Sequence, residues 1–325
     1  MAGFLIDRFG RRVNLYISLA IAAVLNLFLL LPHGLFGLGI LRFLMGLPFA
    51  MITIGNSTLR TDIIPEDKRA VGFSITTISI VVSALVIGPN LGYWVLEWSS
   101  FGFLFPLASI LILVALIIFS TMGFEDIKTK SNTLSINEII EPRVLWFALV
   151  QGLYFIGWPS ILTFGPLYAR EIGLDFIGNF YLVYGIGLLL SRPVSQLIQK
   201  DRMPISMNAI SIAIVVLGHT IIGFFPTSTG FLIGAVFLGT GYGLCSALLQ
   251  KLAFDLVKPE QRGRCSGTLF IGKDIGNIIG MYAFAFTAQA FGSYSFSYLM
   301  TAIVTLAPLL LLIFVALPDY QQKHH

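Results

Sequence analysis

Residues 101–122 read FGFLFPLASILILVALIIFSTM, a continuous run without one charged side chain. A helix of about 20 such residues crosses the hydrocarbon core of a bilayer, which is roughly 30 Å thick. Runs of this kind exclude a transmembrane β-barrel, whose strands alternate apolar and polar residues. The stretch therefore predicts a membrane-spanning α-helix.

The rest of the chain shares this apolar character. Of its 325 residues, 56% are apolar and only 11% are charged, whereas ordinary soluble domains carry about 25% charged residues. The two cysteines, Cys245 and Cys265, give neither a disulfide framework nor a metal-ligand spacing. These features predict an all-α membrane protein with no metal and no cofactor.

Cutting the sequence at charged and turn residues predicts ten complete membrane spans, preceded by a short apolar stub at residues 1–6. The spans run near 13–32, 35–59, 70–96, 101–122, 144–168, 175–196, 205–225, 229–250, 264–290 and 293–317. Most of the 20 basic residues fall in every second linker. Because basic residues accumulate in cytoplasmic loops, we expect the loop after the stub, the central linker and the C-terminus to be cytoplasmic.

A polar stretch at 124–143 predicts a cytoplasmic linker between two helical bundles. Residues 1–123 make an incomplete N-terminal bundle, and residues 144–325 make a C-terminal bundle of six helices. Four spans and the stub precede the linker, while six spans follow it. A protein of two six-helix bundles that lacks its first helix and most of its second would have this pattern.

An internal repeat supports the division into two bundles. The sequence PEDKR at 65–69 has a counterpart in PEQRG at 259–263, and the pair DR at 7–8 recurs at 201–202 with the same offset. Parallel repeats of six helices are found in one architecture of secondary transporters. The repeat therefore favours a transporter.

Several motifs carry a more specific resemblance. The loop GFLIDRFGRR at 3–12 resembles the signature loop of the major facilitator superfamily, between its second and third helices. RFLMG at 42–46 resembles the fourth-helix motif of that family. GPNLG at 88–92 resembles the fifth-helix motif that marks drug:proton antiporters, with Tyr93 in place of its last glycine. TFGPLY at 163–168 is similar to the seventh-helix ending of bacterial efflux members.

This resemblance implies a conformational switch at the cytoplasmic rim. In the family, a charge relay links the signature loop to the end of the fourth helix and holds one conformational state. The residues expected to take part are Gly3, Asp7, Arg8, Gly10, Arg11, Arg12 and Asp62. Ordinary solvated loop charges are the alternative interpretation. Pro89 lacks a backbone donor, so Gly88 and Pro89 predict a helix kink, which serves either as a hinge or only as structure.

Three charged residues are candidates for proton coupling because they lie within predicted spans. Arg42 stands several residues into its span, where a charge costs at least ~2.5 kcal/mol. Lys273 and Asp274 lie about ten residues into theirs and point about 100° apart. The alternatives are an interfacial position for Arg42 and packing against polar loop groups for the other two. Nearby, the glycines at 272, 276 and 280 predict close helix packing.

Helical spacing also predicts a substrate cavity. Phe49 and Asn56 share the helix face of Arg42, while Gln151, Tyr154 and Trp158 recur at i, i+3 and i+7. The family places its cavity among helices that include the fourth, seventh and tenth, and the tenth contributes Tyr242. The alternative is that these aromatic residues only pack within the bundle.

The resemblance implies a major facilitator fold that transports by alternating access. We expect proton-coupled export of a small amphipathic drug or metabolite, in a bacterial-type plasma membrane. A proton-coupled uptake symporter for a sugar or organic acid, and a non-transporting truncated fragment or receptor, are the alternatives. No catalytic cluster of residues indicates an enzyme. The expected partners are a small-molecule substrate, protons and the lipid bilayer, without nucleic acid, and the expected state is a monomer.

Overall fold

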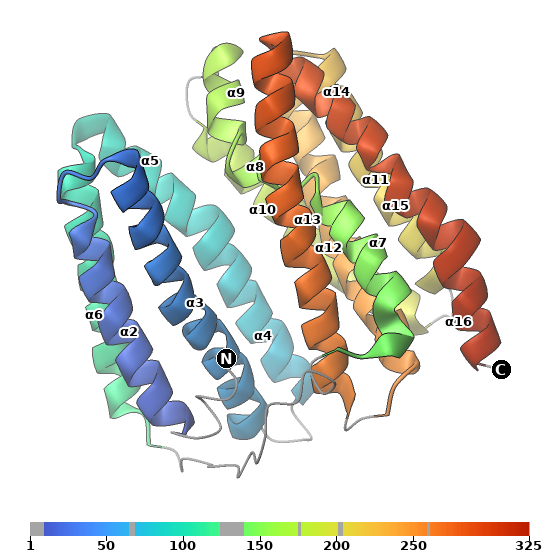
Figure 1. Cartoon of the computed structure of the whole chain (residues 1–325), viewed down its shortest axis with the longest axis horizontal. Coiled ribbons are helices and arrows are strands. Elements are labelled where there is room, and N and C mark those ends of the chain that lie inside the picture. Colours follow the sequence, from blue (N-terminus) through green and yellow to red (C-terminus); the bar gives the residue numbers. More distant parts are fainter. Residues whose placement is uncertain are drawn as a thin grey trace. The chain divides into compact units, whose positions relative to one another are not determined.

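The computed structural model describes residues 10–64, 69–123, 140–174, 177–200, 204–258 and 261–324, and in these ranges it contains helices and no strand. The helices before the central linker are α2 (Arg11–Phe28), α3 (Leu35–Ile63), α4 (Arg69–Val81), a π-helical segment (Val82–Ile87), α5 (Gly88–Trp98) and α6 (Phe101–Thr121). Those after it begin with a 3-10 turn (Pro142–Val144), then α7 (Leu145–Phe155), α8 (Pro159–Leu162), α9 (Gly165–Glu171), α10 (Gly178–Lys200), α11 (Pro204–Phe224), α12 (Ser228–Asp255) and α13 (Arg262–Phe291). The chain ends with α14 (Tyr294–Val304), α15 (Leu306–Leu311), a second π-helical segment (Leu312–Ala316) and α16 (Leu317–His324), as Figure 1 shows.

Each predicted span coincides with one helix or with several consecutive helical segments. Eight helical segments in the described residues are long and apolar enough to cross a membrane. The segment Arg12–Phe28 of α2 is apolar but shorter, and α10, which carries Arg192 and Lys200, is not among the eight. The prediction of an all-α, multi-pass membrane protein is confirmed.

Proline explains where two of these spans are interrupted. The span that begins with α7 breaks after Phe155 and resumes at Pro159, which needs no backbone donor at the first position of α8. The hydroxyl of Tyr298 donates to the carbonyl of Ser160 at 2.6 Å and so holds the resumed turn. In the predicted fifth family helix, the π-helical segment ends immediately before Gly88 and Pro89. A wider turn there relieves the clash between a proline ring and the preceding carbonyls.

Backbone contacts divide the chain into two compact units. The first comprises Met1–Ser79 and Leu91–Leu134, and the second comprises Ile80–Asn90 and Ser135–His325. The predicted linker at 124–143 lies mostly outside the described residues, so the predicted domain boundaries stay a prediction.

In the first unit, buried polar side chains join α2 to its neighbours α3 and α6. Asn26 donates to the carbonyl of Phe105 at 2.8 Å and to the hydroxyl of Ser109 at 3.1 Å. Asn14 donates to the carbonyl of Met51 on α3 at 3.3 Å. Interhelical hydrogen bonds of this kind hold membrane helices together where lipid provides no hydrophobic drive for association.

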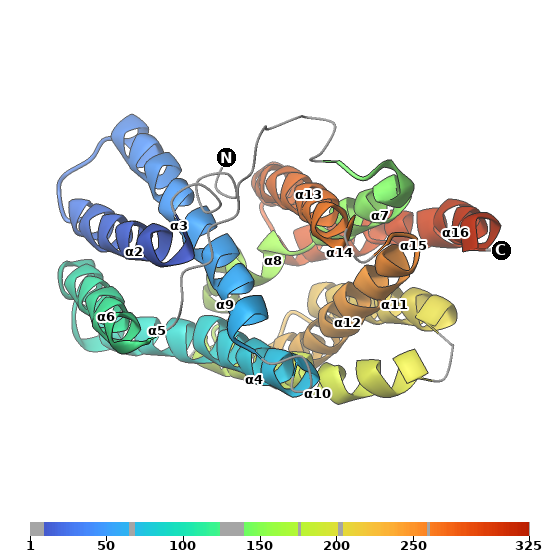
Figure 2. The same cartoon turned by 90° about the horizontal axis from the view of Figure 1, so that it is seen from below.

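In the second unit, α12 packs against both α10 and α11, while α13 lies along α7 (Figures 1 and 2). The predicted glycine stripe forms the contact between α13 and α7. A Cβ atom added at Gly272, Gly276 or Gly280 would collide with the carbonyl of Ala148, Gly152 or Ile156, respectively. The two backbones therefore approach more closely than side chains allow, as small residues permit in membranes.

Candidate functional site

The predicted aromatic residues of α7 and α12 meet inside the second unit. The ring of Tyr242 lies 4.6 Å from that of Tyr154 and 5.1 Å from that of Trp158, between centroids. Phe155 joins them, 5.3 Å from Trp158. Tyr154 and Tyr242 are each only 1% exposed, so they form the packed interior of the bundle and present almost no surface to a ligand. Trp158 is half-buried.

A polar pocket of about 170 Å³ adjoins this aromatic cluster. Its walls come from α7 (Gln151, Phe155), α12 (Ser246, Gln250) and α13 (Ser266, Leu269, Phe270, Lys273). A larger hollow of about 270 Å³ runs along α7 and α13, but aliphatic residues, glycines and Thr268 make up nearly all of its wall. Because the larger hollow offers no charged group, the smaller one, which we call the Lys273 pocket, is the better candidate for chemistry.

Lys273 is half-buried between two aromatic rings. Its ammonium nitrogen lies 5.6 Å from the ring centroid of Phe155 and 5.2 Å from that of Phe270. Both distances are within the range of cation–π attraction. Lys273 makes no ion pair with any residue that the structure describes. Its neighbour Asp274 is exposed and does not line the pocket, so the structure separates the two predicted coupling residues.

Gln151 is the predicted cavity residue that the structure brings to this pocket. Its side chain is 8% exposed, and its carbonyl oxygen has no hydrogen-bond partner in the described part of the chain. A buried polar atom without a partner costs about 1–3 kcal/mol. Such an atom is therefore suited to meet a ligand or a water.

Sequence reasoning missed six of the residues that line the pocket. They are Phe155, Ser246, Gln250, Ser266, Leu269 and Phe270. The available signal was helical spacing, because 246 and 250 share one helix face and 266, 270 and 273 share another. Spacing alone does not show that these two faces meet. The packing of α12 against α13 in the structure shows that they do.

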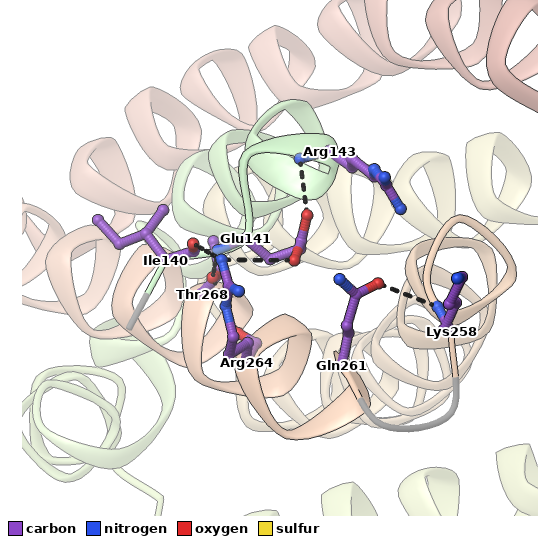
Figure 3. A network of polar contacts seen from close by, with 7 residues as sticks. All are labelled: Ile140, Glu141, Arg143, Lys258, Gln261, Arg264 and Thr268. Carbon is purple, nitrogen blue, oxygen red and sulfur yellow. Dashed lines mark hydrogen bonds and ion pairs between the residues drawn. The ribbon is translucent and has the colours of Figure 1, made fainter. Parts of the chain in front are cut away.

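A second polar cluster joins the starts of α7 and α13 (Figure 3). The guanidinium of Arg264 lies 3.6 Å from the carboxylate of Glu141 and donates to the carbonyl of Ile140 at 2.8 Å. The backbone N–H of Glu141 donates to the hydroxyl of Thr268 at 2.8 Å. Glu141 is 3% exposed, whereas Arg264 is half-exposed, so the carboxylate is the buried partner of this ion pair. The cluster fixes the first turn of α7 against α13.

Three of the seven predicted switch residues, Gly3, Asp7 and Arg8, lie outside the described residues. The side chains of Arg11 and Asp62 are not described. Gly10 precedes α2 with a φ of 86°, a conformation that favours glycine. The guanidinium of Arg12 lies 5.9 Å from the ring centroid of Tyr16. The charge relay among these residues stays a prediction.

The predicted face of α3 is exposed along its length. Arg42, Phe49 and Asn56 all have exposed side chains, and Phe49 is 72% exposed. Gly88 and Pro89 begin α5, directly after the π-helical segment, and that segment packs against α10. The roles of these five residues in coupling, substrate binding and gating stay predictions.

Comparison with known proteins agrees with this architecture. The nitrite extrusion protein of Bacillus subtilis (strain 168) is 23% identical over 99% of this chain and 82% of its own length. The multidrug resistance protein MdtG of Enterobacter lignolyticus (strain SCF1) is 26% identical over 94% of this chain and 75% of its own. The crystal structure of the human organic anion transporter MFSD10 (TETRAN) superimposes with a TM-score of 0.69 at 14% identity. That alignment covers 96% of this chain and 79% of the other.

The structural likeness, at this identity, concerns the fold. The sequence model of the Major Facilitator Superfamily matches residues 1–281 and 207–325, which together span the chain. The signature loop, the helical architecture and this match agree, and the protein therefore belongs to the Major Facilitator Superfamily of membrane transporters.

Proposed function

We propose that the protein exports a small amphipathic molecule in exchange for protons, by alternating access. The observation that carries this proposal is the Lys273 pocket, where a cation, hydroxyls and amides lie beside aromatic rings inside a bundle of apolar helices. A site that combines apolar walls with a few polar groups is typical of small-molecule recognition.

The direction of transport is supported by the relatives. The names of the bacterial proteins that resemble this chain, nitrite extrusion protein and multidrug resistance protein, both describe export or resistance. The GPNLG motif at 88–92, which resembles that of drug:proton antiporters, favours the same direction. We further propose that the membrane is the bacterial plasma membrane and that the basic loops and the C-terminus face the cytoplasm.

Proton exchange requires ionisable groups within the spans. Arg42, Lys273 and Asp274 are the candidates that the sequence provides, and an intramembrane charge is expensive unless it serves a function. The exposed face of α3 brings Arg42 into line with Phe49 and Asn56. We propose that this face and the Lys273 pocket each contribute to transport.

Transport into inside-out membrane vesicles tests this proposal. Vesicles from cells that produce the protein, and from cells that do not, are energised by respiration and given a panel of labelled amphipathic probes. The panel includes a cation (tetraphenylphosphonium), an anion (benzenesulfonate) and a neutral compound (benzenesulfonamide). We expect protein-dependent accumulation of at least one probe and its loss on addition of an uncoupler. No protein-dependent accumulation, or accumulation unaffected by the uncoupler, would contradict the proposal.

A further inference from the structure

We propose that the Lys273 pocket is a binding site for the anionic group of a small organic anion, such as a carboxylate or a sulfonate attached to an apolar body. This inference rests on the proposed transport function for its physiological use, whereas binding itself can be measured without transport. The inference assigns Lys273 to substrate recognition, a role different from proton coupling.

The charge of the pocket is the first argument. Lys273 brings one positive charge to the pocket, and none of the described residues that line it is acidic. Within the described residues the ammonium forms no ion pair. A half-buried charge inside a span gains most from a counter-charge, because the surroundings screen it poorly. A ligand anion would supply the counter-charge that the described residues of the pocket do not.

The polar side chains that line the same pocket supply the second argument. Ser246, Gln250 and Ser266 make no hydrogen bond with any residue that the structure describes. Their hydroxyl and amide groups can all donate, and donors beside a cation are the arrangement that recognises an oxyanion.

The size and apolar walls of the pocket narrow the ligand class. Its volume is about 170 Å³. Such a space admits a charged head group and a few carbon atoms, while drug-sized ligands occupy about 300–1,000 Å³. Phe155, Leu269 and Phe270 line the pocket beside the ammonium, so the body attached to the anion is apolar or aromatic.

The two phenyl rings stabilise the ammonium group within the pocket. Cation–π attraction to Phe155 and Phe270 holds the ammonium at 5.2–5.6 Å from the ring centres, which partly replaces a counter-ion.

Equilibrium binding of labelled benzenesulfonate to the purified full chain in lipid nanodiscs tests the inference. The probe carries a permanent negative charge, and benzenesulfonamide is its neutral counterpart of nearly equal shape. We expect saturable binding that Lys273→Arg retains within about threefold and that Lys273→Met weakens about tenfold or more, because a charge-assisted hydrogen bond is lost. Benzenesulfonamide should compete at least tenfold more weakly than the anion.

The control variant is Lys258→Met, which removes one positive charge from the same unit at a position that does not line the pocket. It should bind benzenesulfonate as the wild type does. Gln250→Leu is a second pocket variant, at an exposed position. It should weaken binding severalfold, and it tests the inference even where Lys273→Met does not fold. The absence of saturable binding to the wild type, equal binding by both lysine-to-methionine variants, or unaltered binding by Gln250→Leu would overturn the inference.

This experiment separates the two proposals. Anion binding in nanodiscs without uncoupler-sensitive accumulation in vesicles would support the anion-binding site and contradict the proposed export. Accumulation of the cationic probe alone, with no anion binding in nanodiscs, would support export and remove the anion site.

Discussion

Lys273 and Asp274 are neighbours in sequence, yet the structure gives them different surroundings. The ammonium of Lys273 lies between two phenyl rings inside a pocket, and the carboxylate of Asp274 is exposed outside it. Consecutive residues on a helix point about 100° apart, so adjacency never implied an ion pair. At the residue scale, the surroundings of each charge decide its role more than its place in the sequence does.

The aromatic cluster allows a test of whether Tyr242 serves in packing or in ligand contact. Tyr242→Phe removes only a hydroxyl whose bond to the carbonyl of Tyr154 is long, at 3.4 Å, so we expect a change below about 1 kcal/mol in unfolding free energy. Tyr242→Ala empties a fully buried position and should cost about 3–5 kcal/mol. Thermal unfolding of the purified protein measures both. Equal melting temperatures for the two variants would contradict a packing role.

The buried ion pair at the start of α7 gives a prediction with an internal comparison. Arg264→Met leaves the carboxylate of Glu141 buried without its counter-charge, which should cost about 3–5 kcal/mol because Glu141 is 3% exposed. Glu141→Gln leaves only the half-exposed arginine, which water can solvate, and should cost less. Thermal unfolding ranks the two variants, and the opposite ranking would show that the pair does not stabilise this end of the bundle.

At the scale of elements, the sequence predicted the bounds of the spans well and the breaks within them less well. Long apolar runs such as 101–122 fixed α6 to within a residue or two. The break between α7 and α8 was not predicted, although Pro159 marks it. The Lys273 pocket was missed as a unit, because its walls come from three helices far apart in sequence, and periodicity describes one helix at a time.

Substitution of glycine by alanine should have opposite effects at Gly276, in the contact between α7 and α13, and at Gly39 on α3. A Cβ at Gly276 collides with the carbonyl of Gly152, so Gly276→Ala should destabilise the protein by about 1–3 kcal/mol. A Cβ at Gly39 on α3 meets nothing within 4 Å, so Gly39→Ala should be neutral or stabilising by up to ~1 kcal/mol. Melting temperatures compare the two. A neutral Gly276→Ala would mean that the helices do not touch there.

The π-helical segment before Pro89 predicts a trade between stability and transport. Pro89→Ala restores a backbone donor and removes the ring that disfavours a regular helix. If this distortion serves as a hinge, the variant should melt at the same or a higher temperature but transport more slowly, by about tenfold in inside-out vesicles. Gly39→Ala serves as the helix-stabilising control. Unchanged transport by Pro89→Ala would leave the distortion with a structural role only.

At the scale of the whole molecule, two compact units and the family match are consistent with alternating access. The exposed face of α3 belongs to the first unit and the Lys273 pocket to the second. A transporter that exchanges substrate for protons needs a site that can be occupied by either in turn. The direction in which a proton gradient drives the substrate is therefore the decisive property.

Transport by purified protein in proteoliposomes under an imposed pH gradient tests this property most directly. The probe is the member of the panel that inside-out vesicles accumulate fastest, and its uptake is followed with the lumen either acidic or alkaline. Exchange for protons predicts accumulation above the external concentration only when the lumen is acidic, and loss of that accumulation when an ionophore collapses the gradient. Accumulation with an alkaline lumen, or equilibration regardless of the gradient, would contradict proton-coupled export.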